Sequence, residues 1–226
     1  MKIETVVNGR PAVLDAKDPY KHERTIVAID PDADKLGVAL VQDGQIRELE
    51  SLDFFDIQDR LQMGCWAGAL FVIEDIDNKN PTYARKGVNA KQQGVINAIS
   101  RKVGRAQNSA RQLITLLERV GVEYVLVEPL RTYEKQRSKK GGEGSVFFKA
   151  LTGWPKRTNE DQRDAAILGL YGLPQDYQVC DKRHVYVGNF CQVCAREQRR
   201  KDVRAARKKA NALMKQREAE TAAAST

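Results

Sequence analysis

Residues 25–40, TIVAIDPDADKLGVAL, decide the fold of this chain. The apolar run at 25–29 predicts a buried strand, and that strand stops on an acid, Asp30. Residues 31–35 predict a turn, after which 36–41 predict a second strand that returns beside the first. An acid fixed at the end of a central strand is a common way to hold a divalent cation. Such a site would need further oxygen ligands from elsewhere in the chain.

The remaining pattern predicts an α/β fold. Asn8-Gly9 and Asp43-Gly44 predict tight hairpin turns, the second of which leads into a third antiparallel strand. The later elements expected are a strand at 46–52, a helix at 56–66, a strand at 70–73, a helix at 89–120, a strand at 122–127 and a helix at 160–171. Residues 131–144 are basic, Gly-rich and without periodicity, which predicts a mobile loop. This order gives a mixed sheet, part antiparallel meander and part parallel, flanked by helices.

Composition narrows the class of protein. With 42% hydrophobic and 30% charged residues, the chain has enough apolar side chains for a packed core. It contains no apolar run near 18 residues and no basic-then-apolar start, so we expect no membrane span and no signal peptide, and a cytoplasmic location. In that compartment the four cysteines are better explained as thiols or metal ligands than as a disulfide framework.

The positive charge is concentrated near the end of the chain. Residues 196–217 hold ten Lys or Arg against Glu197 and Asp202, so this segment alone matches the net charge of +8 of the whole chain. A basic tail on a near-neutral body predicts a polyanionic partner, most often nucleic acid. The alternative is a solvated helix that only aids solubility.

Four acids stand out as candidate ligands. Asp30 and Glu74 each follow an apolar strand, and Asp161 and Asp164 lie three apart near the start of a helix. One helix packed against the edge where those strands end would place four carboxylates around one point. Oxygen-only sites suit Mg²⁺ or Mn²⁺, and two such ions about 3.5–4 Å apart support phosphodiester hydrolysis. The alternative is that these acids only form turns and favour the helix dipole, although with Glu160 the helix start has more acids than a cap requires.

Three of these segments resemble a known family. The segments AIDPDADKLGVAL (28–40), FVIED (71–75) and EDQRDAAILGL (160–170) resemble the first acidic strand, the second acidic strand and the final helix of RuvC-type Holliday junction resolvases, within the RNase H-like superfamily. The long helix before VEYVLVEP (122–129) is also similar. The resemblance covers roughly residues 25–172. Each motif is short, but their order and spacing together are specific.

The resemblance implies an endonuclease that cuts branched duplex DNA. It makes Asp30, Glu74, Asp161 and Asp164 the ligands of two Mg²⁺ or Mn²⁺ ions. It also implies phosphate contacts from lysines near the Gly-rich segment, either Lys149 or the pair Lys139 and Lys140. Because paired symmetrical cuts need two sites, we expect a homodimer, with the helix at 89–120 as a candidate dimer element.

Four further acids lie close in sequence to the first two predicted ligands, Asp30 and Glu74. The family usually has glycine after the Asp-Pro pair, whereas this chain has Asp32 there and Asp34 beyond it. Extra negative charge so near the first ligand could alter metal binding or the approach of a DNA strand. We interpret Asp75 and Asp77 as solvated residues or as supports for the ligands, not as ligands themselves.

A short cysteine-bearing segment predicts a second metal site. Cys180, His184, Cys191 and Cys194 supply four soft or borderline ligands within fifteen residues, and three thiolates with one imidazole form a known structural zinc site. A segment this short has little core, so the metal would fold it, with residues 185–190 as a small hairpin between the two ligand pairs. The thiols could instead be a redox pair or unpaired. We expect the remaining cysteine, Cys65, to be a core residue.

The zinc segment would hold a basic helix that lies along duplex phosphates. Such contacts are sequence-independent and salt-sensitive. The expected contact residues are Arg199, Arg200, Lys201, Arg204, Arg207 and Lys208. The predicted divisions are an N-terminal hairpin or extension (1–24), an RNase H-like nuclease domain (25–173), the zinc segment (174–194) and the basic tail (195–226). Two other functions stay open: a nuclease on RNA–DNA hybrids or flaps, and a non-catalytic zinc-containing nucleic-acid-binding protein.

Overall fold

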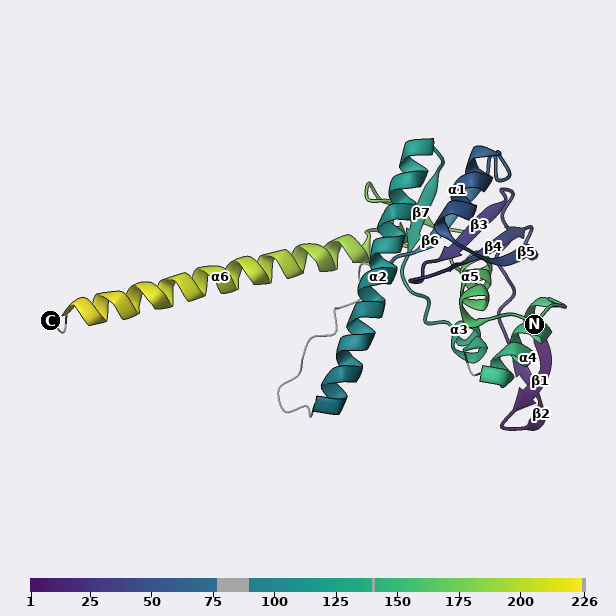
Figure 1. Cartoon of the computed structure of the whole chain (residues 1–226), viewed down its shortest axis with the longest axis horizontal. Coiled ribbons are helices and arrows are strands. Elements are labelled where there is room, and N and C mark those ends of the chain that lie inside the picture. Colours follow the sequence, from purple (N-terminus) through teal and green to yellow (C-terminus); the bar gives the residue numbers. More distant parts are fainter. Residues whose placement is uncertain (77–89, 140, 225–226) are drawn as a thin grey trace. The chain divides into compact units, whose positions relative to one another are not determined.

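The structure, a computed structural model, describes residues 1–76, 90–139 and 141–224 (Figure 1). The chain divides into two compact units, Met1–Val185 and Tyr186–Thr226. The strands are β1 (Lys2–Val7), β2 (Arg10–Asp15), β3 (Ile26–Asp30), β4 (Leu36–Gln42), β5 (Gln45–Leu52), β6 (Leu70–Glu74), β7 (Tyr124–Val127), β8 (Gln178–Val179) and β9 (Val185–Tyr186). The helices are α1 (Phe54–Gln62), α2 (Ala90–Val120), α3 (Tyr133–Ser138), α4 (Gly141–Thr152), α5 (Glu160–Tyr171) and α6 (Gln192–Ala224).

The first unit is built on a five-stranded mixed sheet of order β5-β4-β3-β6-β7. Strands β3, β4 and β5 form an antiparallel meander, whereas β6 pairs with β3 in parallel and β7 pairs with β6 in parallel. The turn between β4 and β5 has positive φ at Asp43 and Gly44, as does the Asn8-Gly9 turn between β1 and β2. The predicted mixed sheet and both predicted hairpin turns are therefore confirmed.

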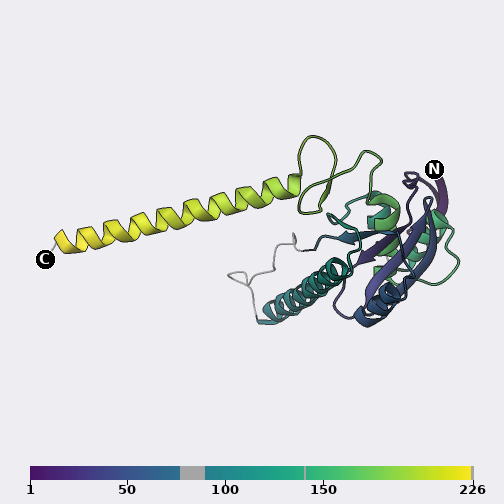
Figure 2. The same ribbon diagram turned by 90° about the horizontal axis from the view of Figure 1, so that it is seen from above.

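Helices cover both faces of this sheet (Figures 1 and 2). Successive residues of β3 point to opposite faces, so Ile26 and Ala28 pack in one core with α5, while Val27 and Ile29 pack in the other with α1 and α2. All five residues of β3 are buried. A strand covered on both faces needs apolar side chains at every position, which explains the unbroken apolar run before Asp30.

The parallel pairing of β3 and β6 brings two predicted acids to one edge of the sheet. Ile29 pairs with Ile73, so Asp30 and Glu74 follow at the same level at the carboxyl ends of neighbouring strands. On the other side of β3, Asp30 pairs with Gly37 of β4. A Cβ atom at Gly37 would collide with the backbone carbonyl of Asp161, so this glycine lets the start of α5 approach the sheet.

Replacing Gly37 by alanine should therefore disturb both folding and the site. We expect Gly37→Ala to lower the free energy of unfolding by about 1–3 kcal/mol, because the added methyl meets rigid backbone. Gly104→Ala is the matched control: Gly104 lies exposed within α2 with open space around it, and alanine there should stabilise the helix by about 0.5–1 kcal/mol. Urea unfolding of both variants checks this; equal stability of the two would contradict the close approach of α5.

Most of the described residues of the segment 131–144 are helical, in α3 and in the first turn of α4, so the predicted mobile loop is wrong there. Thr132 caps α3 by accepting a hydrogen bond from the backbone N–H of Lys135. Helix α4 follows and buries Phe147 and Phe148. Gly144 is needed for packing, because a Cβ atom there would collide with the carbonyl oxygen of Ser138. Gly144 thus serves the close approach of α3 and α4.

Two other elements differ from expectation in extent. Helix α1 ends at Gln62, four residues early, so Cys65 falls in the following turn and is exposed, and its predicted core position is wrong. Trp66 is buried in its place. Along α2 the predicted apolar face packs on the core in its last three turns, whereas Val95 and Ile99 are exposed. Within the described ranges, no helix has the length and apolar character needed to cross a membrane.

Candidate active site

The four predicted carboxylates line one open cavity of about 270 Å³. Asp30 and Glu74 come from the ends of β3 and β6, and Asp161 and Asp164 from the first turns of α5. The wall is completed by residues of the loop after β3, of α2 and of the neighbouring segments: Pro31, Asp32, Ile76, Ile99, Lys102, Val103, Ala106, Lys139 and Glu160. Two larger cavities, of about 680 and 630 Å³, contain no cluster of acids. The predicted acids are thus gathered in the smallest of these three cavities.

The two strand-end acids crowd each other in a buried position. Asp30 and Glu74 are only 9% and 3% exposed. Burial raises the pKa of Asp30 well above its ordinary value, and a hydrogen bond to Glu74 together with the charge of that neighbour raises it further. The charged form of Asp30 is thus disfavoured unless positive charge is supplied nearby.

Asp164 has one oxygen that makes an ion pair and one that has no hydrogen-bond partner. Its Oδ2 lies 2.6 Å from Nζ of Lys139. Its Oδ1 is buried and finds no hydrogen bond among the residues that the structure describes. Burial raises the pKa of Asp164, while Lys135 and Lys139 act to lower it. A buried carboxylate oxygen left without a donor fits a site that receives a cation.

Sequence reasoning missed Lys135, which supplies positive charge from α3. Its Nζ lies 2.6 Å from Oε1 of Glu74 and 3.6 Å from Oδ2 of Asp164, and its side chain is 6% exposed. The ammonium group of Lys135 thus lies between two of the proposed metal ligands, Glu74 and Asp164. A signal was present: Thr132 with Glu134 two residues later is a helix-start pattern, which would have placed Lys135 on an ordered element.

The aspartate that replaces the usual glycine is paired with a residue of α2. Oδ2 of Asp32 lies 3.3 Å from Nζ of Lys102, and this contact raises the pKa of Lys102. Asp161 is half-buried, and its pKa is raised by desolvation first and by the charge of Asp32 second. On the same face of α2, Arg105 pairs with Asp34 at 3.6 Å. The extra acids near the first ligand are therefore partly balanced by cations of α2.

The structure describes all but one of the predicted DNA-contacting residues. Lys139 lines the acidic cavity, Lys149 is exposed on α4, and Lys140 lies outside the described residues. The basic residues of α6 are exposed to solvent, which is compatible with phosphate contacts: Arg199, Arg200, Lys201, Arg204, Arg207 and Lys208. Lys201 also pairs with Glu197 at 2.9 Å along the helix. Contact with DNA stays a prediction for all of them.

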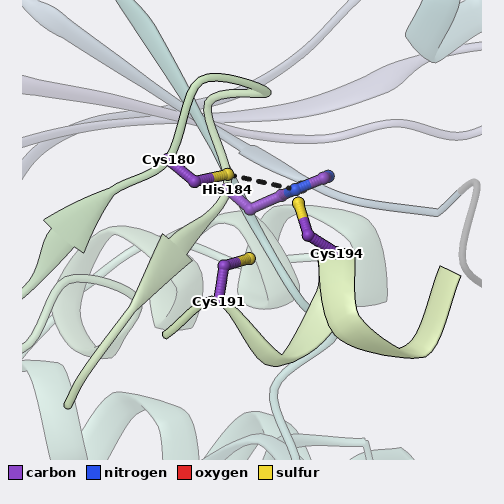
Figure 3. A group of neighbouring side chains, drawn as sticks. All are labelled: Cys180, His184, Cys191 and Cys194. Carbon is purple, nitrogen blue, oxygen red and sulfur yellow. Dashed lines mark hydrogen bonds between the residues drawn. The ribbon is translucent and has the colours of Figure 1, made fainter. Parts of the chain in front are cut away.

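The predicted Cys/His ligands form a cluster, shown in Figure 3. One ligand atom from each of Cys180, His184, Cys191 and Cys194 lies within 4.8 Å of all the others. Zinc–sulfur bonds of about 2.3 Å in a tetrahedron put the sulfurs roughly 3.7 Å apart, so small movements would complete such a site. The hairpin, however, is formed by β8 and β9 around residues 180–184, and its predicted position at 185–190 is wrong.

Asp75 is buried, so a solvated role for it is wrong. It is 6% exposed, and its Oδ2 lies 3.5 Å from Nε2 of His184. Asp77 lies outside the described residues. The residue that follows Glu74 therefore contacts the Cys/His cluster, a link for which the sequence gives no signal.

The sheet order, with acids closing β3 and β6 and a third and fourth acid on α5, defines a mixed-sheet α/β domain with an acidic cavity at one edge of the sheet. Among solved structures the chain is similar to RuvC of Thermus thermophilus. The structure of that protein in complex with a Holliday junction substrate has 13% sequence identity to this chain and a TM-score of 0.38. The match covers 64% of this chain and 90% of the RuvC chain. A second Thermus thermophilus RuvC structure is 14% identical with a TM-score of 0.36, covering 63% and 91%. No protein-family model and no curated protein sequence matches the chain.

Proposed function

We propose that this protein is a metal-dependent DNA endonuclease that hydrolyses phosphodiester bonds in branched duplex DNA. One observation carries the proposal: the four carboxylates at the ends of β3 and β6 and the start of α5 line a single open cavity. Three separate segments of the chain converge there, which a set of turn-forming acids would not require. The nuclease domain of this proposal spans residues 25–173.

The cavity fits divalent cations with oxygen ligands. Asp164 has an unpartnered buried oxygen, and Asp30 and Glu74 crowd each other in a buried position. Two Mg²⁺ or Mn²⁺ ions bound there would activate a water and stabilise the leaving oxygen of the cleaved strand. The two adjacent buried strands β3 and β6 hold Asp30 and Glu74 in fixed positions. Lys135 acts to lower the pKa of Asp30 and of Asp164, which favours the charged forms of both.

Exposed positive charge supports a DNA substrate. The α6 segment carries the excess of Lys and Arg, and phosphate contacts from such a helix give affinity that is independent of sequence and falls with salt. Paired cuts across a junction need two active sites, so the proposal includes a homodimer. The exposed Val95 and Ile99 make α2 the candidate dimer element.

The test is cleavage of a four-way DNA junction in the presence of Mg²⁺. We expect Mg²⁺-dependent cuts in opposite strands of the junction and at least 10-fold slower cleavage of a linear duplex of the same sequence, which corresponds to substrate discrimination of about 1.4 kcal/mol or more. An RNA–DNA hybrid and a 5′ flap complete the panel. Faster cleavage of the hybrid or the flap would replace the junction proposal with the RNase H-like alternative.

A non-catalytic nucleic-acid-binding protein is the second candidate, favoured by the Cys/His cluster next to exposed basic residues. It predicts no cleavage of any substrate in the panel. It also predicts that truncation at Gln178, or Cys194→Ser, abolishes junction binding. Junction binding at full strength by the truncated chain would argue against this candidate.

A further inference from the structure

His184 stands between the cysteine cluster and the carboxylate of Asp75. Its Nδ1 lies 3.5 Å from Sγ of Cys180, the contact drawn in Figure 3, and its Nε2 lies 3.5 Å from Oδ2 of Asp75. The two ring nitrogens therefore face different partners, one a thiol and the other an acid. In histidine metal sites the nitrogen that does not bind the metal donates its N–H to a carboxylate or carbonyl, which fixes the tautomer and the ring orientation.

Asp75 is a buried acid, so a hydrogen-bond donor that faces it has a large effect on its energy. A carboxylate that is 6% exposed is costly to keep charged unless hydrogen-bond donors or a positive charge face it. An imidazole whose Nδ1 binds a metal must carry its proton on Nε2, the atom that faces Asp75. Metal binding at Nδ1 would thus make His184 a fixed donor toward this buried acid.

The turn that carries Cys180 and His184 is attached to the sheet beside the acidic cavity. The backbone N–H of Leu126 in β7 donates to the carbonyl of Arg183 at 2.7 Å, and the guanidinium of Arg183 stacks over the ring of Tyr124 at 4.6 Å. In turn, the N–H of Asp75 donates to the carbonyl of Val127 at 2.7 Å. Asp75 directly follows Glu74, so a continuous set of contacts runs from the turn to an acid of the cavity.

We propose that Cys180, His184, Cys191 and Cys194 bind one structural zinc ion, with His184 coordinating through Nδ1, and that Asp75 is the positioning residue that orients this histidine. Through Asp75 the zinc site also orders the ends of β6 and β7 where Glu74 lies. The inference does not depend on nuclease activity, since both of its readouts, zinc affinity and hydrogen exchange, are measured without DNA.

The first experiment measures zinc affinity of the full-length chain by competition with a chromophoric chelator. The parent should bind one zinc per chain. Asp75→Ala should weaken the affinity about 10–100-fold, and Asp75→Asn, which keeps an acceptor but no charge, should weaken it less. Asp176→Asn is the matched control, because it removes an exposed acid near the segment and should change nothing. Parent-like zinc affinity in Asp75→Ala would overturn the role of Asp75.

The second experiment separates metal binding from orientation. His184→Cys offers four thiolates, so we expect it to bind Co²⁺ with the visible spectrum of a tetrahedral all-sulfur site while losing the contact to Asp75. Hydrogen exchange then reports on the sheet. Zinc removal from the parent should reduce the protection of the Asp75 and Leu126 amides, and loaded His184→Cys should resemble the zinc-free parent at Asp75.

Amides of β4, which lies on the far side of β3 from β6, serve as the internal reference and should be unaffected. Unchanged protection of Asp75 on zinc removal would overturn the proposed link to the sheet, and the absence of stoichiometric zinc in the parent would overturn the metal site itself.

Discussion

Replacing Asp30 by asparagine is expected to reduce Mg²⁺-dependent junction cleavage by about 10³-fold, the loss of roughly 4 kcal/mol of transition-state stabilisation. The amide keeps the size of the side chain but removes the charge that would hold a divalent ion at the end of β3. Single-turnover cleavage at saturating protein measures this effect without a contribution from binding. Asp34→Asn is the matched control, since Asp34 is exposed and outside the acidic cavity.

Although Asp30→Asn should slow cleavage, it should raise the free energy of unfolding of the metal-free protein. Burial and the neighbouring Glu74 raise the pKa of Asp30, so its charged form opposes folding when no metal is bound. Asp30→Asn should therefore unfold at a higher urea concentration than the parent in EDTA, and should gain less than the parent when Mg²⁺ is added. Parent-like cleavage, or lower stability than the parent in EDTA, would contradict the assignment of Asp30 as a metal ligand.

The acids of the cavity could be predicted because strand ends are visible in a sequence. A buried strand is an apolar run, and the residue that ends the run is read off directly, as at Asp30 and Glu74. Asp161 and Asp164 follow from the start of a helix that begins where Asn159 predicts it. What the pattern cannot supply is which strands are neighbours. Here the parallel pairing of β3 and β6 turns two separate strand ends into one site.

The residues that neutralise and connect these acids could not be predicted in the same way. Lys135 and Asp75 are charged and yet buried, and burial of a charge depends on partners that are distant in the sequence. Composition was also misleading at Gly144, which serves close packing of α3 and α4 and not chain flexibility. Cys65 shows a third cause of error, since a helix that ends four residues early moves a core position to the surface.

The second large effect is expected at Lys135. Replacing it by methionine keeps an unbranched apolar stem but leaves Glu74 and Asp164 without the buried ammonium that lies between them. Removing one partner of a buried ion pair costs about 3–5 kcal/mol, and we expect a loss of that size in the free energy of unfolding in EDTA. Lys139→Met is the matched control: Lys139 pairs with the same Asp164 but is 43% exposed, so its loss should cost less than about 1 kcal/mol.

Addition of Mg²⁺ distinguishes two roles for Lys135: a substitute for a bound cation, or a structural partner of the two acids. If the cavity is a metal site, the cation can compensate the uncovered carboxylates, so Mg²⁺ should stabilise Lys135→Met more than it stabilises the parent, in which Lys135 competes for Glu74 and Asp164. Urea unfolding of the parent and both variants, each in EDTA and in Mg²⁺, gives the comparison. If Mg²⁺ does not reduce the loss of unfolding free energy in Lys135→Met, the lysine is a structural partner of these acids and not a substitute for a bound cation. That result would contradict the assignment of the cavity as a metal site.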